Sequence, residues 1–244
     1  MAYDNVWIWL RPLCIALMWL LERIYYICHN WGLSIIVLSV LMRTVSFPLT
    51  RYGMKQQRIL KEKQVQLKPL IHEIEKKFKD DADRSYEETM KLYREHNFSP
   101  FASFKGCLWL LVQIPIFLAL FQILSHSYEI KGASFLWMQD LSLPERLFPL
   151  GVTLPIIGGY FNLLPILMGV VQLIQGYMMN QSGVSDPSSK GQGNKVIYVL
   201  PITMMILFYS FASGLLLYWT TTNICQIFEQ WAVNKRADSR TRNG

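Results

Sequence analysis

The sequence predicts an all-α membrane protein built around five transmembrane helices. Hydrophobic residues make up 52% of the chain, and eight residues are Trp. Apolar stretches of about 20 residues, the length at which a helix crosses a bilayer, recur along the chain, and Lys and Arg gather between them. The predicted transmembrane helices cover residues 31–50, 104–126, 161–180, 195–212 and 213–233.

The first 30 residues are expected to form an amphipathic helix in the external membrane interface, interrupted near Pro12. One face is apolar and consists of Trp7, Leu10, Cys14, Leu17, Met18 and Leu21, while Arg11, Glu22 and Arg23 lie nearby. No basic segment precedes the apolar residues, so no cleavable signal is predicted. A chain that starts outside without an export signal is expected to have lost an upstream span.

Charge predicts the orientation, because Lys and Arg accumulate in cytoplasmic loops. Segment 51–105 holds thirteen of the 24 basic residues. Residues 51–103 are therefore assigned to the cytoplasm, together with the loop 181–194 and the basic tail 234–244, whereas the loop 127–160 is external and has a cap role. The N-terminus is then outside and the C-terminus is cytoplasmic.

The cytoplasmic segment 51–103 is expected to be a helical hairpin. Its first apolar face consists of Leu67, Leu70, Ile71, Ile74 and Phe78, and its second of Tyr86, Met90 and Tyr93. A capping box formed by Ser85 and Glu88 would begin the second helix. The hairpin is either a solvated connector or, as its length indicates, a recruitment element for ribosome or substrate.

Arg43 is the most informative residue of the first span, because arginine stays charged at any accessible pH. Gly32, Ser39, Arg43, Ser46 and Thr50 follow one another at helical spacing and share one face. Such a stripe faces water or protein, and a charge at this depth indicates a functional site. Alternatively, Arg43, which lies about 12 Å along the helix axis from Arg51 at the expected membrane edge, snorkels part of the way toward the headgroups. Snorkelling, however, does not require Ser39 and Ser46 on the same face.

The other predicted spans also carry polar residues at helical intervals. They are Gln113, the pair Gln172 and Gln175, the pair Thr203 and Ser210, and the series Asn223, Gln226 and Gln230. Taken one at a time, each is explained by hydrogen bonding between helices. Together with the Arg43 stripe, they would line a shared hydrated cavity.

The residue types within the spans argue against an enzyme. No predicted span carries Asp, Glu or His in its interior. Glu229 belongs to the last span, but it falls near the cytoplasmic end. Acid–base catalysis and proton relays therefore lack their groups. Cys14, Cys28, Cys107 and Cys225 form no CxxC pair, so neither a metal nor a cofactor is predicted.

Four stretches resemble the YidC family of membrane protein insertases. They are NWGLSII at 30–36, MRTVSFPLT at 42–50, LVQIPIFLALFQIL at 111–124 and SGLLLYW at 213–219, the last followed by Asn223. The resemblance covers nearly the whole chain in unbroken order. The chain looks like the membrane core of that family, without the first span and the large external domain of members from two-membrane bacteria.

The resemblance implies a five-helix bundle in the bacterial inner membrane, enclosing a hydrophilic groove that is open to the cytoplasm and to lipid. The family's groove arginine falls on Arg43, its small hydroxylated residue on Ser39, and its aromatic position on Tyr218 and Trp219, where members often have a second tyrosine. The implied partners are nascent membrane proteins, the ribosome, membrane lipids, and the Sec translocon in a part of the cases. No specific nucleic acid is expected beyond ribosomal contact.

The resulting hypothesis is that Arg43 transiently pairs with acidic groups on the outgoing tail of a substrate. Ser39, Gln113, Asn223 and Gln226 would solvate the tail while its apolar segment passes into lipid. The full predicted groove consists of Arg43, Ser39, Ser46, Gln113, Gln172, Gln175, Thr203, Ser210, Tyr218, Trp219, Asn223 and Gln226. Two other function classes stay open, a small-solute transporter or channel subunit and a non-inserting assembly scaffold.

Overall fold

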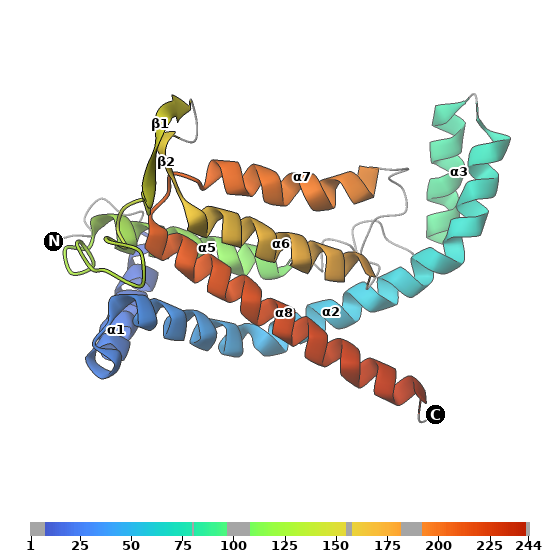
Figure 1. Cartoon of the computed structure of the whole chain (residues 1–244). Helices are drawn as coiled ribbons and strands as arrows, with labels where there is room; N and C mark the ends of the chain where they lie inside the picture. Colours follow the sequence, from blue (N-terminus) through green and yellow to red (C-terminus); the bar gives the residue numbers. More distant parts are fainter. Residues whose placement is uncertain (1–7, 80, 97–107, 155–157, 182–191, 243–244) are drawn as a thin grey trace.

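The computed structural model describes residues 8–79, 81–96, 108–154, 158–181 and 192–242, and most of these residues are helical (Figure 1). The elements in chain order are α1 (Arg11–Cys28), α2 (Trp31–Lys77), α3 (Ala82–Glu95), α5 (Leu108–His126), β1 (Phe148–Leu154), β2 (Gly158–Phe161), α6 (Leu163–Gln181), α7 (Gln192–Leu207) and α8 (Ser213–Arg242).

Helix α1 buries the apolar face that its sequence predicts. Its core side chains are Leu10, Cys14, Leu17, Met18, Leu21 and Ile24, which pack in one cluster with residues of α2, α5 and α8. The expectation that Pro12 interrupts this helix is wrong. Pro12 lies in the first turn, where a missing backbone N–H breaks no helical hydrogen bond, so it begins the helix instead.

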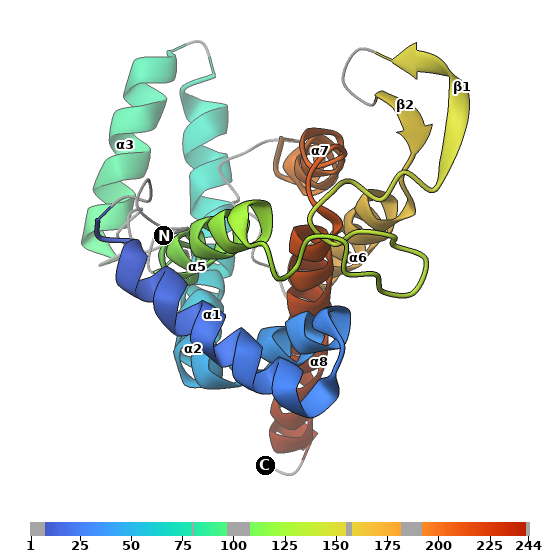
Figure 2. The ribbon, with the colours of Figure 1, turned by 90° about the vertical axis from the view of Figure 1, so that its left-hand side faces the viewer.

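A sharp corner joins α1 to α2. His29 ends α1 in the left-handed conformation with φ of 51°, and the Asn30 side chain caps α2 by accepting a hydrogen bond from the Leu33 amide at 3.0 Å. Tyr25 and Trp31 stack across this corner with ring centroids 4.1 Å apart. The corner sets α1 across the direction of the long helices at one end of the molecule (Figure 2).

The predicted hairpin is present as two packed helices, but its first helix is not a separate element. Helix α2 continues from the predicted span through Pro48 and Pro69 to Lys77, and Figure 1 shows it turning toward α3. Leu67 of α2 and Tyr93 of α3 are buried against each other's helix. The cytoplasmic location of the hairpin stays a prediction.

The predicted capping box at Ser85 and Glu88 is wrong by one helical turn. Asp81 is the N-cap of α3, and its carboxylate accepts a hydrogen bond from the Arg84 amide at 3.1 Å. Aspartate is as good an N-cap as serine, and it occurs earlier in the chain, so Ser85 lies inside the helix.

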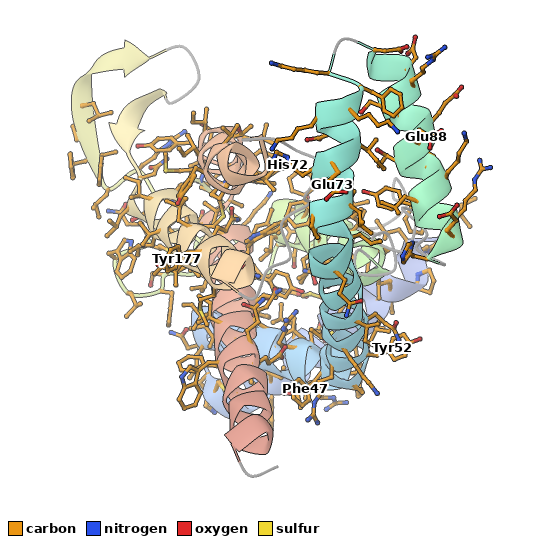
Figure 3. The ribbon with its side chains drawn as sticks, turned by 90° about the vertical axis from the view of Figure 1, so that its right-hand side faces the viewer. Phe47, Tyr52, His72, Glu73, Glu88 and Tyr177 are labelled. Atoms are coloured by element: carbon orange, nitrogen blue, oxygen red, sulfur yellow. The ribbon has the colours of Figure 1, made fainter. Side chains whose placement is uncertain are left out.

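Helix α8 holds the other long helices together. It contacts α2, α5 and α6, whereas α7 contacts α6. Figures 1 and 2 show α8 passing between the α1–α2–α5 group and the α6–α7 pair. Seen from the opposite end, Tyr52 of α2 and Tyr177 of α6 project from opposite sides of the molecule (Figure 3).

The all-α prediction is wrong for the segment between α5 and α6. Strands β1 and β2 pair antiparallel, with Phe148 opposite Phe161 and an irregularity between Pro149 and Leu154. From the sequence, this segment is assigned to the external loop 127–160, and no strand is predicted in it. Gly151 and Gly158 have φ of 72° and 77°, the conformations that a bulged, tightly turned ribbon requires and that glycine adopts without strain.

The segment before β1 is tied to the first turns of α6 and α8. The amides of Ser213 and Gly214 donate to the carbonyls of Leu143 and Leu141, both at 2.9 Å. Glu145 is buried, and its Oε2 accepts a hydrogen bond from the Leu164 amide in the first turn of α6 at 2.7 Å. These bonds satisfy the N-termini of α6 and α8, and they hold residues 127–147, which we call the lid segment, against this end of the two helices.

Among the described residues, one helical stretch is long and apolar enough by itself to cross a membrane, Trp31–Gly53. Three further apolar stretches are shorter, Gln113–Leu124, Leu163–Met178 and Tyr198–Leu207. Helix α8 begins at Ser213, where the last span was predicted to begin, and continues past residue 233 to Arg242. The number of spans stays a prediction.

Candidate functional site

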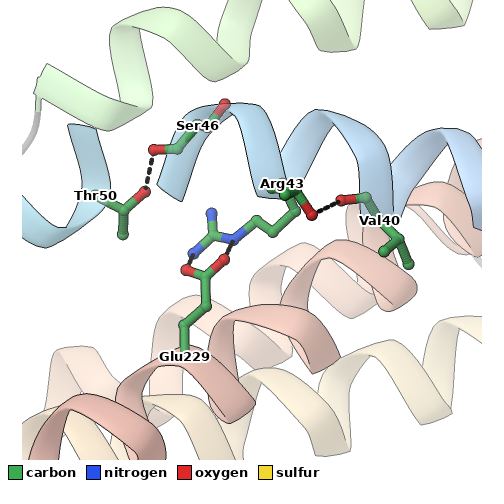
Figure 4. Close-up of polar contacts among 6 residues, drawn as sticks. Val40, Arg43, Ser46, Thr50 and Glu229 are labelled. Atoms are coloured by element: carbon green, nitrogen blue, oxygen red, sulfur yellow. Dashed lines mark hydrogen bonds and ion pairs between the residues drawn. The ribbon is translucent and has the colours of Figure 1, made fainter. Parts of the chain in front are cut away.

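Arg43 forms a two-point ion pair with Glu229 between α2 and α8 (Figure 4). Its Nε donates to Glu229 Oε1 at 3.1 Å, and its Nη2 donates to Oε2 at 2.9 Å. The Arg43 side chain is 2% exposed and the Glu229 side chain 13% exposed. Paired, charge-assisted hydrogen bonds of this kind are the strongest that side chains make, and they let an arginine be buried while charged.

The Arg43 stripe lies on one side of α2, as its spacing predicts, and the structure shows that this side faces the interior of the molecule. Ser39 and Thr50 are buried on the same side of α2, while Ser46 is half-buried. The Ser39 hydroxyl donates to the Ile35 carbonyl at 2.7 Å, and the Thr50 hydroxyl donates to the Ser46 carbonyl at 3.1 Å. Their hydrogens are thus engaged within α2, and their oxygens retain accepting capacity.

A second buried polar contact joins α5 to α8 beside the ion pair. The Gln113 amide nitrogen donates to the Tyr218 hydroxyl at 3.1 Å. Tyr218 is 1% exposed and lies within electrostatic range of Arg43, as does Cys225. The buried polar cluster, as we call it, comprises Arg43, Gln113 and Tyr218, with Glu229 at its edge. Other polar side chains buried on the same helices are Ser39 and Thr50 of α2 and Thr220, Thr222, Asn223 and Gln230 of α8.

Some atoms of these buried polar side chains have no hydrogen-bond partner within the described part of the chain. They are Gln113 Oε1, Thr220 Oγ1, Asn223 Nδ2 and Gln230 Oε1. Buried polar atoms are nearly always hydrogen-bonded in native proteins. Among the atoms just named, Gln113 Oε1 belongs to the side chain whose nitrogen contacts Tyr218, so this contact leaves one acceptor unsatisfied within the described residues.

Trp219 is separated from Tyr218 although the two are adjacent in sequence. Its ring lies 4.9 Å from that of Phe117 and 5.5 Å from that of Phe208, in an aromatic cluster formed by α5, α8 and the end of α7. Neighbouring residues of a helix point about 100° apart, so one ring enters the polar cluster and the other an apolar contact.

The remaining predicted groove residues are not drawn into the buried polar cluster. Gln172 and Gln175 are half-buried on α6, as is Gln226 on α8. Thr203 on α7 and Ser210 just after it are exposed. Spacing within a helix shows which residues share a face, but it does not show which face packs inward.

Glu229 is the member of the site that sequence reasoning missed. It was assigned to the cytoplasmic end of the last span and given no role, whereas the structure pairs it with Arg43. A signal was present, because Glu229 follows Gln226 by three residues and Thr222 by seven, the spacing of one helical face. No group of three or more His, Cys, Asp or Glu side chains suited to a metal occurs among the described residues.

Comparison with known proteins gives one consistent result. Residues 23–240 match the family model described as 60Kd inner membrane protein. The "Membrane protein insertase YidC" of Treponema denticola is 35% identical over 231 residues, covering 93% of this chain and 38% of the relative. That of Syntrophobacter fumaroxidans is 34% identical over 230 residues, covering 94% and 39%.

A solved structure is similar as well. The "Active YidC insertase crystal structure with the first transmembrane domain resolved" has a TM-score of 0.59 and 28% identity, and the match covers 89% of this chain and 45% of the other. The chain thus spans about two fifths of the length of the curated relatives, 38% and 39% for the two named above. Since the family model matches most of the sequence, the chain belongs to the 60Kd inner membrane protein family.

Proposed function

We propose that this chain is the membrane-embedded working part of an insertase and chaperone for newly made membrane proteins. Its family membership and the names of its relatives support this function. The observation that carries the proposal is the arginine held almost completely buried in a polar cluster between α2 and α8. A charge at such a position is costly to maintain and marks a functional site in membrane proteins.

The proposed architecture is a five-helix membrane bundle made of α2, α5, α6, α7 and α8, with a hydrophilic groove around the buried polar cluster. Helix α1 would lie in the external interface, since exposed Trp19 lies on it, exposed Trp9 precedes it, and it crosses the direction of the long helices. The α2–α3 hairpin and the C-terminal tail would lie in the cytoplasm, because the basic residues concentrate there.

The physical problem for an insertase is the polar tail that must cross about 30 Å of hydrocarbon. Each charge at the bilayer centre costs several kcal/mol, and a polar groove that reaches part of the way shortens the dry path. Arg43 would pair with an acidic group of the tail, while Gln113, Asn223 and Ser39 hydrogen-bond to its backbone. The membrane potential contributes about 2.3 kcal/mol per charge per 100 mV and pulls an acidic tail outward.

The proposed partners follow from this role. Nascent membrane proteins would be the substrates, delivered by the ribosome with or without the Sec translocon, and the apolar segment would leave into membrane lipids. The α2–α3 hairpin and the basic tail are the proposed recruitment elements, since both carry dense charge. Gln172 and Gln175 of α6, Ser46 of α2 and Gln226 of α8 would form the more exposed wall of the groove.

Reconstitution tests the function directly. The purified chain in liposomes receives a short single-span substrate with an acidic tail, and insertion is scored as protection of the tail from added protease. We expect insertion well above that of empty liposomes, and Arg43→Ala should reduce it at least about tenfold, which corresponds to one lost charge-assisted hydrogen bond. Arg43→Lys should retain most of it.

A substrate with a neutral tail serves as the matched control. Arg43→Ala should affect its insertion much less than that of the acidic substrate. Equal losses for both substrates would contradict the pairing role of Arg43, and no insertion above empty liposomes would contradict the insertase function itself. Leakage of a small encapsulated dye, measured in the same liposomes, would indicate a channel instead.

A further inference from the structure

The edge of the Arg43 guanidinium that is formed by Nε and Nη2 already binds a carboxylate. Glu229 accepts hydrogen bonds from both Nε and Nη2 of the guanidinium, and both of its carboxylate oxygens are engaged. One edge of a guanidinium presents two parallel N–H groups and matches one carboxylate at a time. A substrate acid therefore has to displace Glu229 to form the same two-point contact with this edge.

We propose that Glu229 is an internal competitor for Arg43, which sets how strongly and for how long the site holds an acidic tail. The inference rests on the proposed function and adds a specificity-determining residue to it. When an acidic tail binds to Arg43, its carboxylate replaces that of Glu229. A neutral tail, which cannot replace the charge, leaves the pair intact.

The two partners differ in their access to water, and this difference gives the exchange a direction. The Arg43 side chain is 2% exposed, so moving it into solvent would break its contacts with the buried residues around it. Glu229 is 13% exposed and sits at the edge of the buried polar cluster, so it has a short path to solvent when an incoming acid replaces it. The guanidinium is then never left as an unpaired buried charge, which would be strongly destabilising.

The exchange also solves the problem of release. A lone buried arginine would bind an acidic tail tightly, because desolvated charge-assisted hydrogen bonds are strong. With Glu229 next to it, departure of the tail re-forms the internal pair, so the site loses no ion pair at any stage. The net affinity for the tail is the difference between two similar contacts, which favours rapid turnover.

Equilibrium binding to the full chain in detergent micelles tests the proposal. The probes are two fluorescent single-span peptides of equal length, one with two Asp residues in its tail and one with two Asn residues. Glu229→Gln, which removes the charge and keeps the shape, is expected to bind the Asp peptide about tenfold more tightly than the wild type does, through slower dissociation. Its affinity for the Asn peptide should stay unchanged.

Glu22→Gln is the matched control, because it changes the net charge by the same amount at an exposed position on α1. It should alter the affinity for neither peptide. Unchanged affinity of Glu229→Gln for the Asp peptide, or an equal gain for both peptides, would overturn the proposal. Equal loss for both peptides, with a lowered unfolding temperature, would do the same and would identify the pair as a clamp between α2 and α8.

A second variant keeps the test decisive if Glu229→Gln does not fold. Glu229→Asp retains the charge but shortens the side chain by one methylene group, so it should weaken the internal pair and raise the affinity for the Asp peptide by a smaller factor. No change there overturns the proposal. If Arg43→Ala removes the preference for the Asp peptide while both Glu229 variants have no effect, the competitor role fails and the proposed function stands.

Discussion

At the scale of single residues, the arrangement around Arg43 follows from the cost of burying polar groups. The guanidinium is compatible with the interior because a carboxylate faces it, and the hydroxyls of Ser39 and Thr50 are satisfied by carbonyls of their own helix. Within the described residues, the Gln113 amide nitrogen donates to the Tyr218 hydroxyl, and the amide oxygen has no partner there. Polar contacts of this kind are sensitive to the removal of one partner.

Tyr218→Phe is expected to destabilise the protein by about 1–3 kcal/mol, because the Gln113 nitrogen would remain buried without its acceptor. The double variant Gln113→Leu with Tyr218→Phe should recover much of this loss, since neither polar partner then remains. Thermal unfolding in detergent micelles, analysed as a double-mutant cycle, measures both effects. Strictly additive costs of the two single variants would show that the contact is energetically unimportant.

At the scale of elements, close approaches determine where the helices end and meet. Gly32, in the first turn of α2, lies so close to Phe135 that a Cβ at this position would overlap the phenylalanine ring. Phe135 is held in a tight turn by two backbone hydrogen bonds with Met138, both 2.9 Å long. Gly214 is similarly confined at the start of α8, where a Cβ would lie 3.0 Å from the Leu141 carbonyl oxygen.

Gly32→Ala is therefore expected to destabilise the fold by about 1–3 kcal/mol, the usual cost of overpacking. Phe135→Ala in the same chain should relieve most of the clash. Gly53→Ala is the matched control within α2, because a Cβ there would meet nothing within 4 Å, and it should stabilise the helix by up to about 1 kcal/mol. Unfolding temperatures followed by circular dichroism test this, and a neutral Gly32→Ala would disprove the close contact.

At the scale of the whole molecule, the two ends differ in chemistry. One end carries α1, the lid segment and the β1–β2 ribbon, while the α2–α3 hairpin extends from the other end (Figures 1 and 3). Tyr128 and Leu136 at the first end are exposed, whereas charged residues dominate the second. The concentration of basic residues at the second end is the basis of the proposed orientation, in which the end that carries α1 lies outside the cell, and this orientation stays a prediction.

Labelling of single cysteines tests the orientation. In a chain whose native cysteines are replaced, a cysteine at Tyr128 should react with a membrane-impermeant maleimide in intact spheroplasts. A cysteine at Lys91, on the exposed face of α3, should react only after the membrane is permeabilised. Both positions are exposed in the structure, so access to the reagent differs only through the membrane. The reverse pattern would contradict the proposed orientation.

Several features could be predicted from the sequence because they depend on local periodicity. The inward face of α1, the stripe that contains Arg43, and the start of α8 at Ser213 are all properties of one helix and its spacing. The two local errors concern helix starts. Pro12 was expected to interrupt a helix whose first turn it occupies, and Ser85 was expected to cap a helix that Asp81 caps one turn earlier.

Contacts between distant segments were decided by the tertiary structure alone. Arg43 and Glu229 are 186 positions apart, and no spacing rule connects them. The separation of Tyr218 from Trp219 and the exposure of Thr203 likewise depend on which side of each helix meets a neighbour. The sequence by itself determined that most of the chain is helical and which residues share the face of the arginine. The packing of α8 against α2 determined the partner of that arginine, because a buried charge takes the opposite charge that the fold brings within reach.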